Sequence, residues 1–261
     1  MQGQLRFAVL GDPIDHSRSP AIHTAALIHL GLDGRYLAIR AGSAELRAAV
    51  AQLRAGSLHG FNVTMPLKEE AASLAEDLTE EASRSGSVNT MRARDGVIEG
   101  HSSDVVATVK ALSDPRFDLQ APVLVLGAGG AAAALLVGAQ DRNLYVASRT
   151  EQLARALLDR VGIEAGVVTF GAGVTGALVV NATPLGMAGE HLPEQITGVA
   201  SGIIDLAYGP TETPTVSKAR ETGVPVMDGV EFLVLQAAVS FEWWLGRPAP
   251  LEVMVAAARN A

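Results

Sequence analysis

Short apolar runs alternate with amphipathic segments along the first hundred residues, which is the pattern of an α/β protein. Strand-like runs cover 5–10, 36–39 and 58–63, and helical periodicity covers 20–30 and 44–54. Ser19 and Ser43 stand where N-caps of these helices are expected. Asp95-Gly96 lies between the strand-like stretches 88–91 and 97–98 and predicts a β-hairpin. This half is therefore predicted to form a mostly parallel sheet that includes one hairpin.

A second alternation follows the helical stretch 105–112, which Asp114-Pro115 is expected to end. Its strand-like runs are 123–126, 144–147, 167–170, 178–181 and 203–206. Helical segments separate several of these strands, at 131–140, 151–160 and 214–221, and two more helices at 231–245 and 251–258 close the chain. Such regular alternation predicts a doubly wound parallel sheet. The fold class is therefore α/β, with two α/β domains.

Composition narrows the function mainly by exclusion. The chain has 261 residues, 48% of them hydrophobic, with no cysteine and a net charge of −8. Its length fits one large domain or two ordinary ones, and the lack of cysteine excludes disulfides, thiol nucleophiles and thiolate metal sites. The negative charge argues against nucleic acid as a partner. No apolar run reaches the ~18 residues that span a membrane, and Met1 to Arg6 contain no signal-peptide segment. We therefore expect a soluble, cytoplasmic protein.

A glycine-rich turn follows the strand-like run 123–126. It reads Gly127-Ala128-Gly129-Gly130-Ala131-Ala132, a G-x-G-x-x-A pattern that lets the backbone approach a pyrophosphate at a helix N-terminus. The next strand ends in Ser148-Arg149-Thr150, with no acid for a ribose 2′-hydroxyl, and Arg149 can accept a 2′-phosphate. These features predict a dinucleotide site that prefers NADP to NAD. The alternatives are a structural glycine turn, a solvated Arg149 and an ordinary capping role for Thr150.

Lys68 stands in an unusual position for a cation. Asn62 and Thr64 share one face of the strand that leads into a helix, which Pro66 is expected to start. Lys68 then falls in the first helical turn, where the helix dipole favours anions. A carboxylate partner or a role in proton transfer would explain it. The simpler interpretation pairs Lys68 with Glu69 or Glu70 on a solvated face.

Other polar residues suit a small hydroxylated or carboxylated ligand. Ser17 and Ser19 follow the first strand, and Asn89 lies in the stretch Ser85 to Thr90. Taken singly, Ser19 as a helix cap and Asn89 as a turn residue are the simpler interpretations. Ser102-Ser103-Asp104 precedes the helical stretch 105–112, where one capping residue would suffice. Asp104 is therefore a candidate either for capping or for chemistry.

In combination the motifs resemble shikimate dehydrogenases from Leu5 to about Gly246. They read GDPIDHSRSPAIH, NVTMPLK, GSVNT, SSD, VLGAGGA, SRT, NATPLGM, DLAYGPTETP and EFLVLQAAVSFEWWLG. The resemblance implies a substrate-binding domain of residues 1–105 plus 237–261 and a Rossmann-type NADP-binding domain of residues 106–236, facing each other across a cleft. It implies NADPH-dependent, reversible reduction of 3-dehydroshikimate to shikimate in the chorismate route of aromatic amino acid biosynthesis.

The resemblance also implies roles for individual residues. Lys68 would be the general acid/base and Asp104 its partner, which leaves Ser103 as the expected helix cap. The substrate-binding residues would be Ser17, Ser19, Thr64, Asn89, Asp104, Tyr208 and Gln236, and Asn62 is a further candidate. The cofactor-binding residues would be Gly127, Ala128, Gly129, Gly130, Ala131, Ser148, Arg149, Thr150, Leu206 and Gly229. No metal is expected, because the six histidines show no ligand spacing. The enzyme would be a monomer or homodimer.

Three places depart from the family's usual pattern, and one of them is only the apolar Leu67, which stands where phenylalanine is common. Ser102-Ser103-Asp104-Val105 stands where N-T-D-G is usual, and Leu153 stands where a second basic residue commonly follows N-R-T. These departures leave open a quinate or aminoshikimate dehydrogenase with relaxed cofactor use. They also leave open a catalytically weak, nucleotide-binding regulatory protein. The presence of both Lys68 and Asp104 favours an enzyme.

Overall fold

The computed structural model describes residues 4–261, so the first part of the N-terminal stretch considered above lies outside the described residues. The chain divides into two compact units. The first comprises the chain up to Val106 together with Leu233–Ala261, and the second comprises Ala107–Phe232. Each unit contains one six-stranded sheet covered by helices, so the predicted class of two α/β domains is confirmed.

The sheet of the first unit is mixed, with the strand order β2-β1-β3-β5-β6-β4. Its strands are β1 (Leu5–Gly11), β2 (Gly34–Arg40), β3 (Gly60–Val63), β4 (Asp77–Leu78), β5 (Thr90–Arg94) and β6 (Val97–His101). Strand β1 pairs in parallel with β2 and β3, whereas β5 runs antiparallel to both β3 and β6. The hairpin between β5 and β6 turns at Asp95, whose φ of 53° is positive, as the Asp-Gly pair predicts.

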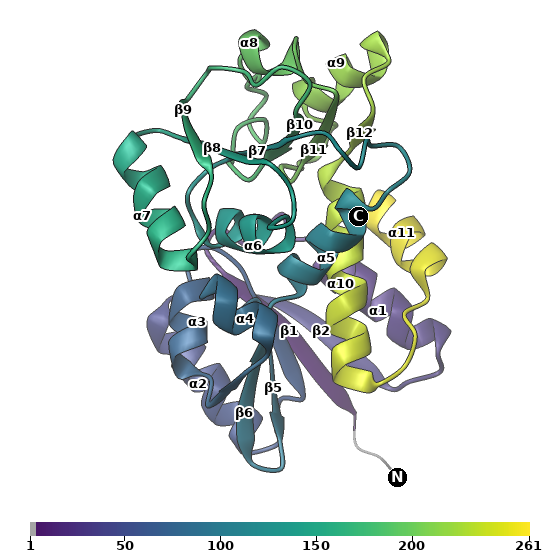
Figure 1. Ribbon diagram of the computed structural model, residues 1–261. Coiled ribbons are helices and arrows are strands. Elements are labelled where there is room, and N and C mark those ends of the chain that lie inside the picture. Colours follow the sequence, from purple (N-terminus) through teal and green to yellow (C-terminus); the bar gives the residue numbers. More distant parts are fainter. Residues whose placement is uncertain (1–3) are drawn as a thin grey trace. The chain divides into compact units, whose positions relative to one another are not determined.

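Helices cover both faces of this sheet (Figure 1). They are α1 (Ser19–His29), α2 (Ser43–Arg54), α3 (Lys68–Leu74), α4 (Glu80–Ser85), α10 (Gly229–Leu245) and α11 (Leu251–Arg259), together with the start of α5 (Ser103–Leu112). Phe7 of β1 stacks on Trp244 of α10, whereas the next residue, Ala8, joins the apolar core that includes α2 and α3. Alternation along the strands therefore assigns α1 and α10 to one face and α2 and α3 to the other.

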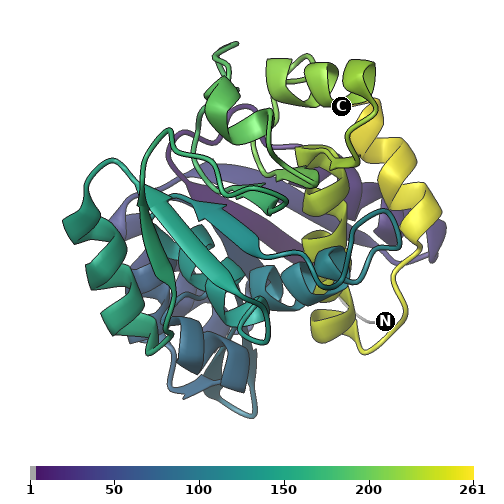
Figure 2. The same cartoon turned by 45° about the horizontal axis from the view of Figure 1, so that its top comes forward.

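The sheet of the second unit is entirely parallel, with the strand order β12-β11-β10-β7-β8-β9. Its strands are β7 (Val123–Leu126), β8 (Leu144–Ser148), β9 (Gly166–Thr169), β10 (Leu178–Asn181), β11 (Gly202–Asp205) and β12 (Val226–Met227). Figures 1 and 2 show its helices, α6 (Gly130–Gly138), α7 (Glu151–Val161), α8 (Glu194–Thr197) and α9 (Pro214–Thr222). The strand order reverses between β7 and β10, which is where ligands bind in such sheets.

Several predicted element boundaries are wrong. Ser19 and Ser43 are the first helical residues of α1 and α2 rather than their N-caps. The N–H of Gly42 bonds to Glu45 Oε2 at 2.8 Å, while the hydroxyl of Ser43 donates to Glu70. Pro66 does not start α3, because it lies in the turn before the helix, whose first residue is Lys68.

Four short elements were not predicted. They are β4, α4, α8 and β12, of two to six residues each. Segments this short contain too few residues to show a hydrophobic period, so the pattern along the chain does not reveal them.

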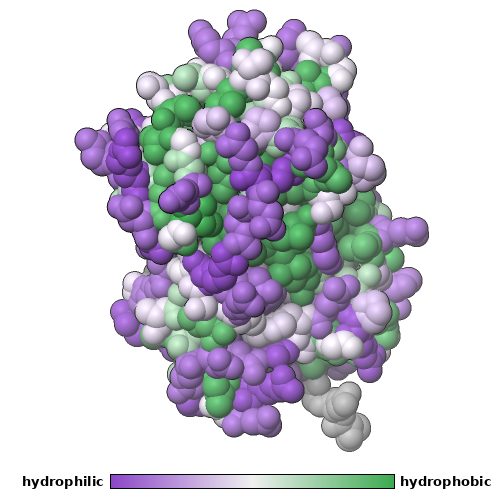
Figure 3. Space-filling view, in the orientation of Figure 1, coloured by the Kyte–Doolittle hydropathy of each residue, from purple (hydrophilic) through white to green (hydrophobic). Residues whose placement is uncertain are grey.

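Polar side chains cover much of the face shown in Figure 3, with smaller apolar areas between them. Of the large exposed apolar side chains, Ile28 is the most exposed at 70%. Within residues 4–261, no helix combines the length and the apolar character needed to cross a membrane.

Candidate active site

Lys68 and Asp104 form an ion pair in the first unit. Lys68 is the first residue of α3 and Asp104 is the second residue of α5, and Lys68 Nζ lies 2.5 Å from Asp104 Oδ2. The two side chains are only 16% and 8% exposed, so the charges are largely withdrawn from water. Glu70 instead bonds to Ser43 and Arg47, so it is not the carboxylate that pairs with Lys68. The cation that the helix dipole disfavours therefore has a carboxylate partner from another helix.

The start of α5 links this ion pair to Asn89. The backbone N–H of Ser103 donates to Asn89 Oδ1 at 2.8 Å, and the Ser103 hydroxyl lies 3.0 Å from the same oxygen. Because Ser103 is the first residue of α5 and its hydroxyl contacts Asn89, the expectation that it caps the helix is wrong. The neighbouring Ser102 hydroxyl is fully buried and has no hydrogen-bond partner among residues 4–261.

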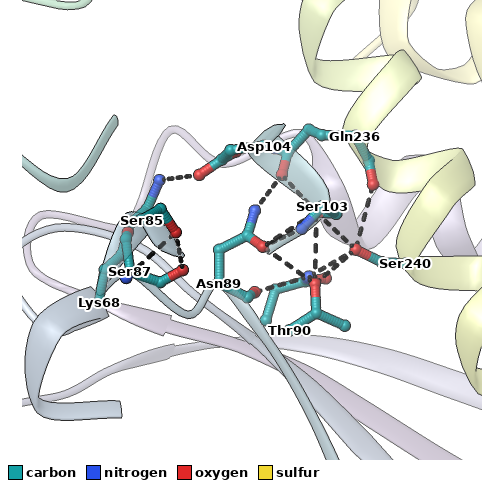
Figure 4. A network of polar contacts seen from close by, with 10 residues as sticks. Lys68, Ser85, Ser87, Asn89, Thr90, Ser103, Asp104, Gln236 and Ser240 are labelled. Carbon is teal, nitrogen blue, oxygen red and sulfur yellow. Dashed lines mark hydrogen bonds and ion pairs between the residues drawn. The ribbon is translucent and has the colours of Figure 1, made fainter. Parts of the chain in front are cut away.

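A second polar pair joins Asn89 to α10. Asn89 Nδ2 donates to Gln236 Oε1 at 2.9 Å, although 147 residues separate the two in the sequence. Figure 4 shows this pair together with the Lys68–Asp104 pair. Since Asp104 directly follows Ser103, the first turn of α5 contributes Asp104 to one pair and contacts the other pair through Ser103. The structure therefore brings together four residues that the sequence predicted as site residues.

A buried network lies beneath these pairs. Asn62 Oδ1 accepts a hydrogen bond from the Tyr36 hydroxyl at 2.7 Å, and Asn62 Nδ2 donates to the backbone oxygen of Asn89. Thr90 and Ser240 complete the network with their hydroxyls, 2.8 Å apart. Sequence reasoning missed Tyr36, Thr90 and Ser240. A signal existed only for Ser240, a polar residue one helical turn after Gln236 in an otherwise apolar stretch.

Ser17 and Thr64 lie in loops that follow strands β1 and β3, and Ser19 begins α1 directly after the first of these loops. The N–H of Ser19 contacts the Ser17 hydroxyl at 3.4 Å. A Cβ atom at Gly11, the last residue of β1, would lie 2.2 Å from Thr64 Cγ2, so only glycine lets the end of this strand approach Thr64 so closely. Within residues 4–261, no hydrogen bond joins Ser17 or Ser19 to the Lys68–Asp104 pair.

In the second unit the glycine-rich turn joins β7 to α6. Gly127 has a φ of 122°, and a Cβ atom there would lie 3.2 Å from the backbone oxygen of Ala182. A Cβ atom at Gly129 would meet no atom within 4 Å. The turn is thus packed on one side and open on the other, beside the unpaired N–H groups at the start of α6. Backbone groups arranged this way bind anions such as phosphate.

The segment after β8 presents one unpaired cation. The hydroxyl of Thr150 accepts from Leu153 N–H and caps α7, as the simpler interpretation of this residue held, and Ser148 donates to the backbone oxygen of Thr150. Arg149 is exposed and has no side-chain partner in the described part of the chain. Arg155, one turn into α7, is held by Glu151. Arg149 is therefore the guanidinium available to an anion here.

Two polar residues that sequence reasoning missed end neighbouring strands of this unit. Asn181 and Asp205 are register partners of β10 and β11, and Asn181 Nδ2 donates to Asp205 Oδ1 at 2.8 Å. Burial raises the pKa of Asp205, and hydrogen bonds from Thr213, Asn181 and the N–H of Ala207 lower it in part. The sequence feature that could have identified Asn181 and Asp205 is their position at the carboxyl ends of apolar strands, where ligands bind in such sheets.

The loop after β11 carries the remaining predicted residues, Leu206 and Tyr208. Gly229 begins α10 against this loop, because a Cβ atom there would lie 2.5 Å from the backbone oxygen of Ala207. Among residues 4–261, no three histidine, aspartate or glutamate side chains come together as metal ligands.

One buried histidine lies away from these groups. His23 of α1 stacks on Tyr36, with ring centroids 4.4 Å apart, and its Nε2 has no hydrogen-bond partner among residues 4–261. Burial lowers the pKa of His23 from 6.5 to about 3. The imidazole is therefore neutral at neutral pH.

Known proteins resemble this chain along nearly its whole length. Residues 9–91 match the family model of the shikimate dehydrogenase substrate binding domain, and residues 229–259 match that of the shikimate 5'-dehydrogenase C-terminal domain. A shikimate dehydrogenase (NADP(+)) from Nitrosopumilus maritimus is 35% identical over 261 residues, which is 95% of this chain and 96% of the relative.

Solved structures give the same result. The shikimate 5-dehydrogenase of Thermus thermophilus, in complex with NADP(H) and shikimate, is 34% identical with a TM-score of 0.88, covering 98% of this chain and 99% of that one. The shikimate 5-dehydrogenase of Listeria monocytogenes, in complex with shikimate and NAD, is 28% identical with a TM-score of 0.82, covering 97% and 96%.

Proposed function

The chain belongs to the shikimate dehydrogenase (NADP+) family of oxidoreductases, and from this membership we propose that it reversibly reduces 3-dehydroshikimate to shikimate with NADPH, using Lys68 and Asp104. The observation that carries the proposal is the largely buried ion pair between these two residues, 2.5 Å apart, joined through α5 to the Asn89–Gln236 pair. A charged pair taken out of water is costly unless its surroundings compensate it, so a chemical role explains its place.

Lys68 is proposed as the general acid and base. Reduction of a ketone builds negative charge on its oxygen, and an ammonium group at that point stabilises the charge and supplies the proton. In the reverse direction the neutral amine takes the proton of the substrate hydroxyl. Asp104 holds Lys68 Nζ in place through its Oδ2 atom. When bound, NADPH supplies the hydride that reduces the carbonyl carbon.

The substrate is proposed to bind through neutral donors in the first unit, within the substrate-binding domain of residues 1–105 plus 237–261. The amides of Asn89 and Gln236 and the hydroxyl of Thr64 suit its ring oxygens. Ser17 and Ser19 offer hydroxyls to its carboxylate. Asn62 is not included, because its amide is used within the protein. Tyr208 is added on the family resemblance alone.

NADP is proposed to bind to residues 106–236. The residues fit the cofactor: the turn Gly127 to Ala131 is open at Gly129 and lies at a helix N-terminus, as a pyrophosphate requires. Arg149 is a free guanidinium for the 2′-phosphate, between Ser148 and Thr150. Leu206 and Gly229 are proposed to lie near the nicotinamide.

A dehydrogenase with less strict cofactor choice is the second candidate. Leu153 is 45% exposed where a second cation would help, and Arg155 is already paired with Glu151. A 2′-phosphate would therefore meet one free guanidinium. This candidate includes enzymes that act on quinate or an aminoshikimate.

A matrix of turnover rates separates these functions. Purified protein is assayed with shikimate, quinate and an aminoshikimate, each with NADP+ and NAD+, and in reverse with 3-dehydroshikimate and NADPH. The proposal expects the highest kcat/KM for shikimate with NADP+. A higher value with quinate or an aminoshikimate assigns the second candidate. Tight NADPH binding without turnover of any substrate contradicts both and leaves the regulatory protein.

A further inference from the structure

We propose that Ser240 is a positioning residue of the candidate site, whose hydroxyl holds the turn of α10 that carries Gln236 against α5 and the sheet, so that the Asn89 and Gln236 amides stay placed to offer N–H donors to the substrate. The inference rests on the proposed function, since it names how the same site selects its ligand. Ser240 lies in α10, is fully buried, and touches none of the residues of the Lys68–Asp104 pair through a hydrogen bond between described residues.

The orientation of the Asn89 amide follows from a donor that cannot reverse. The backbone N–H of Ser103 lies 2.8 Å from Asn89 Oδ1, so this atom of the amide must be the oxygen. Asn89 Nδ2 then faces α10, and its partner at 2.9 Å must be the oxygen of Gln236. Gln236 Nε2, with two hydrogens, has no protein partner among residues 4–261. Both amides therefore have N–H groups left for a ligand atom that accepts.

Ser240 holds this arrangement at the α10 end. Its hydroxyl lies 3.0 Å from Ser103 Oγ, 2.8 Å from Thr90 Oγ1 and 3.1 Å from the backbone oxygen of Gln236. It also accepts from Asn62 Nδ2 at 2.9 Å. Because Ser240 follows Gln236 by one helical turn, these contacts tie the turn of α10 that carries Gln236 to α5 and to the sheet.

Removing the Ser240 hydroxyl would weaken these contacts between α10, α5 and the sheet. Thr90 would lose its 2.8 Å partner and would keep only its longer contacts as a donor, to Asn89 Oδ1 at 3.2 Å and Ser103 Oγ at 3.3 Å. Asn89 Oδ1 already accepts from the N–H and the hydroxyl of Ser103. Buried polar groups without full partners are costly, so the turn of α10 that carries Gln236 would be held less firmly against Asn89 and α5. Substrate binding should weaken, whereas proton transfer by Lys68 should change less.

The test compares Ser240→Ala with Ser240→Thr, which keeps the hydroxyl. For Ser240→Ala we expect the KM for shikimate to rise about tenfold, the effect of about one lost hydrogen bond, with kcat within about threefold and the KM for NADP+ unchanged. Ser240→Thr should restore the KM to within about threefold of the wild type. Equal shikimate KM values for wild type and Ser240→Ala, or equal impairment of both variants, would overturn the proposal.

Ser113→Ala is the matched control. Like the hydroxyl of Ser240, the hydroxyl of Ser113 bonds to the carbonyl oxygen four residues earlier in its helix, at a distance of 2.8 Å. Unlike Ser240, it contacts no residue of the candidate site. It should leave both KM values unchanged. A KM for shikimate that rises as much as in Ser240→Ala would overturn the role of Ser240, since loss of a helix contact alone would then explain the effect.

A second variant keeps the test decisive if Ser240→Ala does not fold. Thr90→Val retains the side-chain shape and removes the hydroxyl that lies 2.8 Å from Ser240. It should raise the KM for shikimate about fivefold with little change in kcat, and an unchanged KM would contradict the network. Failure of the proposed function is distinguishable, because the wild type would then not turn over shikimate at all. Wild-type turnover with an unchanged KM in the variants overturns only the inference on Ser240.

Discussion

The two candidate sites of this chain are built in opposite ways. In the first unit, side chains from distant segments bond to one another: Lys68 and Asp104 are 36 residues apart, and Asn89 and Gln236 are 147 apart. In the second unit, the glycine-rich turn consists of consecutive glycines and alanines between one strand and the helix that follows it. The first depends on the chemical identity of side chains, and the second depends on the shape of the backbone.

This difference determines which substitutions each site can tolerate. A site of paired side chains loses function when one partner is removed, even if the backbone does not move. A site of backbone N–H groups loses function when a side chain changes the path of the chain or fills the space of the ligand. Substitutions in the two units should therefore fail through different measurable quantities, kcat and KM in one and stability or cofactor affinity in the other.

The largest effect is expected at Lys68. Lys68→Ala removes the proposed acid/base and should lower kcat about 100-fold or more, the usual contribution of such a group, with a smaller change in KM. Steady-state kinetics with shikimate and NADP+ measure it. Lys110→Ala, an exposed lysine of α5, is the control and should match the wild type. An unchanged kcat in Lys68→Ala would contradict the assigned role.

Substitutions in the glycine-rich turn of the second unit should act through the shape of the backbone. Gly127→Ala forces a side chain to a φ of 122° and to within 3.2 Å of Ala182 O, so it should lower the free energy of unfolding by about 2 kcal/mol. Gly129→Ala meets open space at a φ of −92° and should change that free energy by less than about 0.5 kcal/mol, but its methyl group should weaken NADPH binding. Urea unfolding and NADPH fluorescence titration measure the two quantities. Equal stability of both variants would contradict the distinction.

The same difference explains what the sequence predicted. The strands and helices of the second unit, and its glycine turn, follow from local patterns: β7 reads Val-Leu-Val-Leu, is buried throughout and leads directly into the turn. In the first unit, Lys68 was recognisable because a cation at a helix N-terminus is locally disfavoured. Its partner was assigned by the family resemblance, since periodicity alone does not say which carboxylate of the chain lies nearby.

The rest depends on tertiary contacts that no local pattern encodes. Thr90 has an ordinary place in a strand, and Ser240 is marked only as a polar residue in an apolar stretch. Their roles depend on hydroxyls that meet only after folding. The N-caps expected at Ser43 and Ser103 were wrong for the same reason, because each hydroxyl bonds to a distant residue. A serine near a helix start is a sufficient cap by itself, but the hydroxyl of Ser103 has the competing partner Asn89.

His23 extends the comparison to a buried side chain of the first unit whose polar atom lacks a partner among residues 4–261. The unfolded chain binds a proton at His23 below pH 6.5, whereas the folded chain does so only near its pKa of about 3. The protein should therefore lose stability at this residue as the pH falls from about 6.5, by up to about 1.4 kcal/mol per pH unit. His23→Phe keeps a ring against Tyr36 and should remove this dependence. Urea unfolding at pH 7, 6 and 5 measures it, and parallel pH profiles of the two proteins would contradict the assignment.

The smallest effect on stability is expected at Ser102. It tests the role of side-chain partners most directly, because the hydroxyl of the neighbouring Ser103 has hydrogen-bond partners and that of Ser102 has none among the described residues. Ser102 Oγ is buried without a hydrogen bond between described residues, so Ser102→Ala should change the free energy of unfolding by less than about 0.5 kcal/mol, or raise it. Ser103→Ala removes a hydroxyl that lies 3.0 Å from both Asn89 Oδ1 and Ser240 Oγ, so it should cost about 1 kcal/mol and raise the KM for shikimate. Equal costs at the two positions would mean that burial of the hydroxyl, rather than its partners, sets its contribution. The side-chain identities of the first site would then matter less than their packing.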